Sequence, residues 1–401
     1  MKENFREKIL KNGMTVLFEK REVPVVSVAF AVRQGGINER GNEKGISHYI
    51  EHMLYKGTKK RSAKKISEEI ERNGGMMNGF TDEMITAFWC KMPSKHVNVA
   101  LDVLSDMMKN SLFNEKELEK ERKVIFEEIK MRKDNPMIYV FDRIHSLLYE
   151  KPFGIPIIGT FETMNSISRE KITRKFKEVY QPNNMILCVV GDADFEKIVK
   201  FAEKNFGNKK IIAQASRVKT RNELQTERRK GIDQTHLVFA YHVPLANDKK
   251  SHAANVLSVL MAEGMSSRLF REIREKRNLA YAVKGDAEIC RNFAYNFIYL
   301  GIRKENLEKV KKLVLEEFEK VSENLGEKEL KSVKEQMTGN NKISMEDSQN
   351  QMMNLLSHEI NGRAEDFYDF EKNILNVKLK DVKEIAKKAR EEYSFFALVP
   401  E

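Results

Sequence analysis

Apolar residues follow two different periods along the first half of the chain. Runs rich in Val, Ile, Phe and Leu predict β-strands, because such residues pack well on a pleated sheet, at residues 14–18, 25–32 and 185–190. Apolar residues at helical spacing predict long helices at about 95–110 and 114–133, the second of which ends before Asn135-Pro136. This mixture predicts an α+β fold.

The second half of the chain repeats this order of elements. Residues 237–241 resemble 26–30, residues 293–299 resemble the strand around Trp89, and the segment EKEL occurs at both 115–118 and 327–330. A repeat of this length indicates two homologous domains rather than a solenoid. We therefore expect an N-terminal domain at 1–208, a polar linker at 209–231 and a C-terminal domain at 232–401.

Composition and charge narrow the possible functions. Of the 401 residues, 41% are hydrophobic and 33% are charged, and the longest apolar runs are far too short to span a membrane. The net charge of +11 comes from basic residues interleaved with acidic ones, so no nucleic-acid partner is expected. The first ten residues contain acids and no apolar core segment, which predicts no targeting signal and a cytoplasmic location. Buried free thiols are expected at Cys90, Cys188 and Cys290.

The densest chemical pattern is the stretch GISHYIEHMLYKG at residues 45–57. On a helix, His48 and His52 lie one turn apart on one face, so that both can bind a single metal ion. Glu51 lies between them and can reach a water at that metal. This H-x-x-E-H order reverses the H-E-x-x-H zinc motif. The alternative is a pair of solvent-facing or capped histidines on an amphipathic helix.

A third ligand is expected from another helix. Glu121 and Glu128 are two helical turns apart and share a face with Val124 and Ile125, whereas Glu127 lies among lysines. Carboxylates on an apolar face are costly unless a partner compensates them, and a metal ion would do so. The alternative is that Arg or Lys side chains neutralise both carboxylates.

The second copy lacks these candidate ligands. With Gly264 aligned on Gly57, the first His, the Glu and the second His of the motif are replaced by Asn255, Ser258 and Val259. On the matching helix, the two carboxylates are replaced by Val333 and Asn340. Only the first domain is therefore expected to bind a metal.

On these motifs the chain resembles the pitrilysin-like family of inverted zinc metallopeptidases. It is most similar to the short two-domain branch, which includes bacterial processing-protease-like proteins and mitochondrial processing peptidase. The resemblance covers essentially the whole chain and is most specific at residues 45–58, 73–81, 121–129, 154–160, 181–192 and 264–281. The expected fold class is α+β, with two homologous domains that each form a mostly antiparallel β-sheet with helices packed on one face.

The resemblance implies a role for each candidate residue. One zinc ion (Zn²⁺) per chain is expected on His48, His52 and Glu128, with Glu51 as the general base and Glu121 supporting a ligating histidine. From the second domain, a pair is expected to hold the substrate near the metal, namely Arg274 and Tyr281, the latter also as a catalytic hydrogen-bond donor. The edge that accepts the substrate as an added β-strand is expected at Asn78, Gly79, Phe80 and Thr81, with Gly79 standing where the family usually has Ala.

Together these expectations describe a zinc metalloendopeptidase that hydrolyses peptides or unfolded protein segments. In this branch some subunits keep the zinc ligands and lack the Arg/Tyr pair, and their partners do the reverse. This chain carries both sets, so a homodimer is expected rather than a complex with a different subunit. The alternative is a catalytically silent peptide-binding or scaffold subunit of the same fold.

Overall fold

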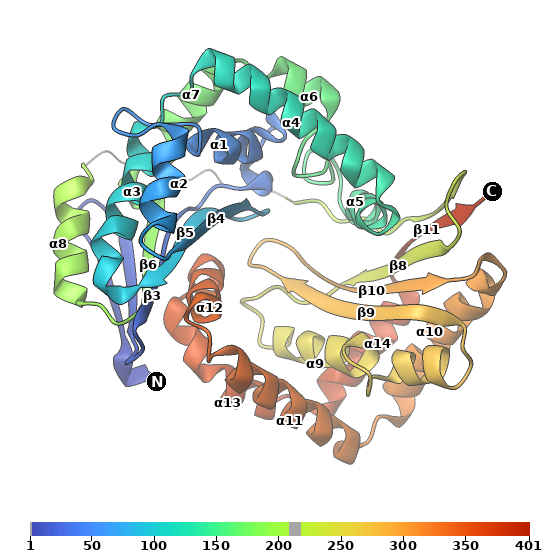
Figure 1. The fold of residues 1–401 in the computed structure, drawn as a ribbon. Helices are drawn as coiled ribbons and strands as arrows, with labels where there is room; N and C mark the ends of the chain where they lie inside the picture. Colours follow the sequence, from blue (N-terminus) through green and yellow to red (C-terminus); the bar gives the residue numbers. More distant parts are fainter. Residues whose placement is uncertain (1, 208–217) are drawn as a thin grey trace. The chain divides into compact units, whose positions relative to one another are not determined.

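The computed structural model describes residues 2–207 and 218–401 (Figure 1). Contacts within the chain define two compact units. Unit 1 comprises Met1–Ile129, Ile155–Ser216 and Ser344–Tyr368. Unit 2 comprises Lys130–Gly154, Arg217–Ile343 and Asp369–Glu401.

Unit 1 is built on a six-stranded sheet in the order β1-β2-β6-β3-β5-β4. Its strands are Phe5–Ile9 (β1), Thr15–Lys20 (β2), Val25–Val32 (β3), Met76–Thr81 (β4), Thr86–Pro93 (β5) and Met185–Gly191 (β6). Neighbouring strands are antiparallel except for the parallel pair β2 and β6. The three strands expected from the sequence are confirmed as β2, β3 and β6, and β4 forms one edge of the sheet.

Helices from the first half of the chain lie on one side of this sheet. They are Ile46–Leu54 (α1), Ala63–Glu71 (α2), Val97–Asn110 (α3), Glu115–Asp134 (α4), Phe161–Ser166 (α6), Arg169–Val179 (α7) and Phe195–Asn205 (α8). Helices α3 and α4 confirm the two long helices that apolar spacing predicted. The apolar side of α3 packs on β3 and β5, where Val28, Phe30 and Phe88 belong to the same buried core.

The opposite face of the first sheet is covered by a helix from the second half of the chain. Helix α12 (Ser348–Asn361) contacts β3 and β6 (Figure 1). Its Met352 and Leu355 pack with small sheet residues such as Ala29 and Ala31. Polar contacts anchor the same segment to β2. The buried carboxylate of Glu19 accepts hydrogen bonds from the Gln351 amide, at 2.7 Å, and from the Tyr368 hydroxyl.

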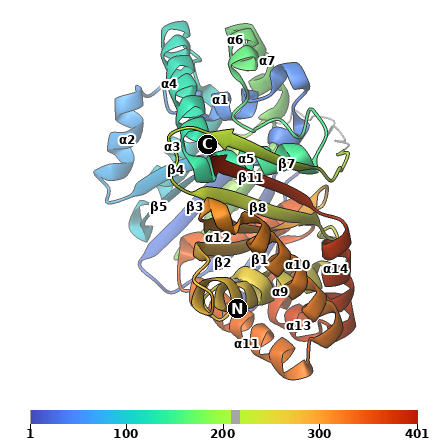
Figure 2. The same ribbon diagram turned by 90° about the vertical axis from the view of Figure 1, so that its right-hand side faces the viewer.

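Unit 2 contains a five-stranded sheet in the order β7-β11-β8-β10-β9. Its strands are Leu224–Arg229 (β7), Thr235–His242 (β8), Ala280–Ile289 (β9), Ala294–Ile302 (β10) and Ser394–Pro400 (β11). Figure 2 shows β7, β11 and β8 running beside one another. Only β7 and β11 are parallel. Across the sheet, the strands β7-β11-β8-β10-β9 therefore pair in the same directions as β2-β6-β3-β5-β4 in unit 1. The duplication predicted from the sequence is therefore present in the topology.

The helices of unit 2 also cover both faces of their sheet. They are Pro136–Leu148 (α5), Ser251–Ala262 (α9), Leu307–Asn324 (α10), Glu327–Ser344 (α11), Phe370–Leu375 (α13) and Leu379–Glu391 (α14), with a π-helical turn at Phe270–Glu275 (η6). Helices α9, α10 and α14 share one core. Helix α5, from the first half of the chain, lies on β8 and β11, with the ring of Tyr139 beside that of Phe396.

The two halves of the chain therefore exchange segments. The expected division into domains at 1–208 and 232–401 did not include this exchange. Lys130–Gly154 belongs to unit 2 and Ser344–Tyr368 belongs to unit 1. Each sheet thus has a helix on its second face, in addition to the helices expected on one face. In the expected linker at 209–231, residues up to 217 lie outside the described residues, and Leu224–Arg229 forms strand β7 instead. As an edge strand that pairs only with β11, β7 needs no apolar run, which explains why its polar sequence resembled a linker.

The exchange predicts that the first half cannot fold alone. A fragment of residues 1–207 lacks α12, so the apolar residues on the second face of its sheet would be exposed to water. We expect this fragment to show no cooperative thermal unfolding by circular dichroism, and co-expression with residues 218–401 to restore it. A cooperative transition in the isolated fragment would contradict the role assigned to α12.

Candidate metal centre

Helix α1 is held at its start by a buried carboxylate. Glu39 accepts hydrogen bonds from the backbone N–H groups of Gly45, at 2.9 Å, and Ser47, at 2.7 Å, which would otherwise lack partners at a helix N-terminus. Gly45 has a φ of 93°, and a Cβ there would lie 2.6 Å from the carbonyl oxygen of Ile158, so only glycine fits. The buried face of the helix comprises Ile46, Tyr49, Ile50, Met53 and Leu54. His48, Glu51 and His52 therefore lie on the other face.

Helix α4 is joined to α1 by a buried hydrogen bond, which the Tyr49 hydroxyl donates to the carbonyl oxygen of Leu118 at 2.6 Å. On α4, Glu121 is 6% exposed, and Glu128 is half-buried. Glu127 is exposed, as its position among lysines predicted. Val124 was wrongly placed on the inner face and is 48% exposed, because it lies at the edge of the buried stripe formed by Leu118, Glu121 and Ile125.

The three predicted ligands converge on one point. Glu128 Oε2 lies 3.6 Å from His48 Nε2 and 3.7 Å from His52 Nε2. Among the described residues, this is the one group of three or more His, Cys, Asp or Glu side chains whose ligand atoms lie within 4.8 Å of one another. Two imidazoles and one carboxylate are a donor set that zinc uses at catalytic sites, where a fourth position is kept for water or substrate. The residues therefore fit a zinc ion.

Glu121 sets the orientation of His52. Its Oε2 lies 3.1 Å from His52 Nδ1, and its Oε1 forms an ion pair with Lys56 Nζ at 2.7 Å. A hydrogen bond at Nδ1 keeps the proton there and directs the lone pair of Nε2 toward Glu128. Sequence reasoning did not assign Lys56, although its position one helical turn after His52 places it on the same face.

Glu51 is held by the edge strand of the sheet. The Thr81 hydroxyl, on β4, donates a hydrogen bond to Glu51 Oε2 at 2.6 Å. Burial raises the pKa of the Glu51 carboxyl, whereas this hydrogen bond and the neighbouring His52 oppose the rise. Thr81 was expected only in the substrate-binding strand, and the structure also makes it a partner of the expected base.

The remaining residues of the expected substrate strand, Asn78, Gly79 and Phe80, lie on β4 at the edge of the sheet. A Cβ on Gly79 would lie 2.6 Å from the hydroxyl oxygen of Tyr55, which extends from the end of α1. The Tyr55 hydroxyl thus fills the space that an alanine methyl group would need. This packing explains the glycine at this position.

The expected substrate-holding pair, Arg274 and Tyr281, lies in unit 2. The Arg274 guanidinium stands 4.9 Å from the ring centroid of Phe270 in the same π-helical turn. Tyr281, on edge strand β9, is 44% exposed, and its hydroxyl lies 3.3 Å from that of Tyr299. Its ring lies over Gly301, where any Cβ would overlap it. The metal ligands all belong to unit 1, so the role of this pair stays a prediction.

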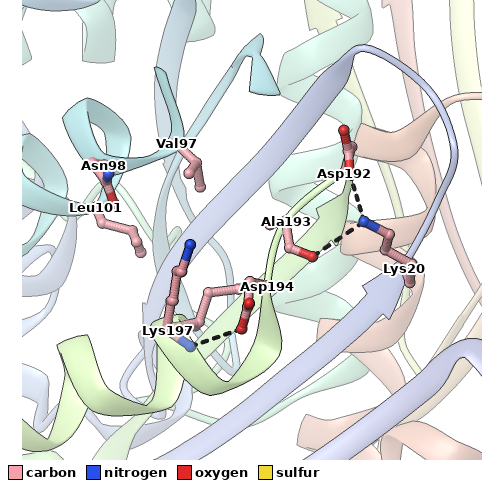
Figure 3. A pocket seen from close by; sticks show the side chains of 9 residues that line it. Lys20, Val97, Asn98, Leu101, Asp192, Ala193, Asp194 and Lys197 are labelled. Atoms are coloured by element: carbon pink, nitrogen blue, oxygen red, sulfur yellow. Dashed lines mark hydrogen bonds and ion pairs between the residues drawn. The ribbon is translucent and has the colours of Figure 1, made fainter. Parts of the chain in front are cut away.

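A separate cavity of about 400 Å³ in unit 1 contains none of the predicted site residues (Figure 3). Its charged groups have structural roles. Lys20 forms an ion pair with Asp192 at 2.5 Å, and Asp194 caps α8 by accepting a hydrogen bond from the backbone N–H of Lys197.

In the part of the chain that the structure describes, no helix has the length and apolarity needed to cross a membrane.

The repeated sheet-and-helix unit and the two-His, one-Glu donor set define the class of inverted-motif zinc peptidases. Residues 15–161 match the model of the insulinase family (peptidase family M16), and residues 166–337 match that of the peptidase M16 inactive domain. An uncharacterized zinc protease of Rickettsia felis is 34% identical over 348 residues, which cover 85% of this chain and 84% of that protein. The uncharacterized zinc protease YmxG of Bacillus subtilis is 32% identical over 348 residues, 85% of each chain.

A solved structure of a Helicobacter pylori protease has the same fold, with a TM-score of 0.90 at 24% identity over 99% of both chains. The chain belongs to peptidase family M16. The match to the inactive domain falls largely on the second copy of the repeat, where Val and Asn replace the candidate ligands.

The contact between Glu121 and His52 predicts that Glu121 supports metal binding. We expect Glu121→Gln to lower zinc affinity by roughly 10–100-fold, because an amide is a weaker acceptor than a carboxylate for the His52 Nδ1–H group. Competition with a chromogenic chelator measures this affinity. The matched control is Glu127→Gln, an exposed position on the same helix. An equal loss of affinity in both variants would contradict the assignment.

Proposed function

We propose that the protein is a zinc-dependent endopeptidase that hydrolyses peptides or unfolded protein segments. The observation that carries this proposal is the convergence of His48, His52 and Glu128, with Glu51 on the same face of α1. The relatives are named as zinc proteases, and these names support the same chemistry for this chain. One zinc ion per chain accounts for all three ligands.

The residues around the metal position have complementary tasks in this reaction. Bound zinc would act as a Lewis acid, which would lower the pKa of a water molecule and polarise the scissile carbonyl group. Glu51 accepts a proton from the attacking water and delivers it to the leaving amine. The Thr81 hydroxyl bonds to Oε2 of Glu51, which orients the carboxylate and leaves Oε1 to accept the proton.

Substrate binding is proposed at the edge of the first sheet. Strand β4 offers backbone N–H and C=O groups at this edge, and an extended peptide can add to it as a further strand. Thr81 belongs to β4 and bonds to Glu51, so a peptide on this strand would lie next to the base. Arg274 and Tyr281 are proposed to bind the substrate carbonyl and the developing oxyanion.

A catalytically silent subunit is the competing hypothesis. Its main support is the match of residues 166–337 to a domain described as inactive. The lost ligands, however, are those of unit 2, where the repeat has Asn255, Val259 and Asn340. Unit 1 retains His48, Glu51, His52 and Glu128, which favours an active enzyme.

The proposal predicts that Glu51→Gln separates metal binding from turnover. The variant keeps all three ligands but loses the base, so we expect bound zinc to be unchanged and cleavage of an unstructured peptide library to fall by roughly 10²–10⁴-fold. Elemental analysis and mass spectrometry of the products measure the two quantities. Undiminished cleavage by Glu51→Gln would overturn the assignment of the base, and a wild type without zinc or cleavage would favour the scaffold hypothesis.

Because one chain carries both the ligands and the Arg/Tyr pair, we propose that it acts as a homodimer in the cytoplasm without a different subunit. Light scattering on the purified protein is expected to give the mass of two chains, and the same fractions are expected to cleave peptides. The expectation fails if activity appears only after a second, different subunit is added.

A further inference from the structure

Unit 2 contains a cavity beside the position that corresponds to the metal centre of unit 1, and of the residues that replace the three candidate ligands it is Val259 that lines this cavity. Gly264 and Gly57 follow the corresponding helices α9 and α1, and both have positive φ, at 80° and 115°. Gly285 on β9 packs against Ala262 at the end of α9, as Gly79 on β4 packs against Tyr55 at the end of α1. These matches support the alignment of Val259 with His52, and the repeated segment EKEL at 115–118 and 327–330 aligns Val333 with Glu121.

The cavity has a physical cause in these substitutions. In unit 1, His52 and Glu121 fill the space between α1 and α4 and bond to each other. In unit 2, Val259 and Val333 are both shorter, and a cavity of about 500 Å³ lies beside them. Such a volume lies within the usual range of small-molecule sites in proteins.

The lining of this cavity combines an apolar floor with a cationic rim. Val259, Leu260 and Val333 form the floor and are 8%, 3% and 8% exposed. Arg271 and Lys328 lie on the rim, both exposed, and within the described residues neither side chain forms an ion pair.

The single acid in the lining does not cancel this positive charge. Glu329 is already neutralised by Arg268, whose guanidinium bonds to both carboxylate oxygens at 2.8 Å and 2.6 Å. The Gln336 amide adds a neutral hydrogen-bonding group to the lining. An anionic head and an apolar body are therefore both accommodated.

We propose that this cavity binds a small carboxylate with an apolar side chain. The side chain would lie on Val259, Leu260 and Val333, and the carboxylate would bind Arg271 and Lys328, since charge-assisted hydrogen bonds to a carboxylate are strong. A free apolar amino acid derivative and the C-terminal end of a short peptide share this chemistry. Inorganic phosphate does not, because it has no apolar part. The site lies beyond the proposed peptidase reaction and needs neither metal nor turnover.

Binding can be located directly with two probes on the zinc-loaded, full-length protein. N-acetyl-leucine represents the free molecule and N-acetyl-Gly-Gly-Leu the peptide end, each compared with its C-terminal amide. We expect at least one acid to bind saturably by calorimetry and to shift the methyl resonances of Val259, Leu260 and Val333. The amides and inorganic phosphate are expected to bind roughly tenfold more weakly or not at all. Whichever acid binds more tightly identifies the source of the ligand.

Arg271 and Ser332 line the cavity and are exposed, so each can be substituted without disturbing the core of the fold. Arg271→Gln is expected to weaken binding of the acid by roughly tenfold. The control Lys331→Gln removes the same charge from an exposed position on α11 outside the lining and is expected to have no effect. Ser332→Tyr, at an exposed lining residue, is expected to block the cavity. Equal binding of acid and amide, equal effects of Arg271→Gln and Lys331→Gln, or no saturable binding would overturn the proposal.

Discussion

The chemistry of unit 1 depends on one buried carboxylate, that of Glu121, between a histidine and a lysine. A carboxylate in a nearly dry position is unfavourable alone, and its two oxygens are compensated separately by His52 and Lys56. The same contacts orient His52 toward Glu128. The Tyr49 hydroxyl, which bonds to α4 one turn earlier, keeps the two helices in this register. The convergence of the three candidate ligands thus rests on the pairing of α1 with α4.

The exchange of helices between the halves of the chain covers the second apolar face of each sheet. Both faces of the first sheet are apolar, as Val28 and Phe30 on one face and Ala29 and Ala31 on the other illustrate. The helices of the first half cover only one face, so the second must be covered from elsewhere in the chain. Helix α12 does so for unit 1, and α5 does so for unit 2. A duplicated chain in which each copy covers the other's sheet makes the two copies depend on each other for stability.

Duplication also explains why one fold holds two different kinds of site. The helix pair α1 and α4 and the helix pair α9 and α11 occupy corresponding places beside their sheets. Polar residues that compensate each other can converge at such a place, as His52 and Glu121 do. When valine replaces both His52 and Glu121, as Val259 and Val333 do in unit 2, no buried charge is left uncompensated. The loss of stability is then limited to that of an incompletely filled space. The second copy could therefore lose its ligands and keep its fold.

The sequence alone determined those features that local spacing encodes. Helical periodicity placed His48 and His52 on one face and distinguished Glu121 and Glu128 from Glu127, and β-branched runs located the central strands. Tertiary structure decided what depends on contacts between distant segments. The bond from Thr81 to Glu51, the pairing of Lys56 with Glu121 and the strand formed by Leu224–Arg229 all require partners far along the chain. No local pattern carries that information, because a partner across a sheet or between helices leaves no period in the sequence around it.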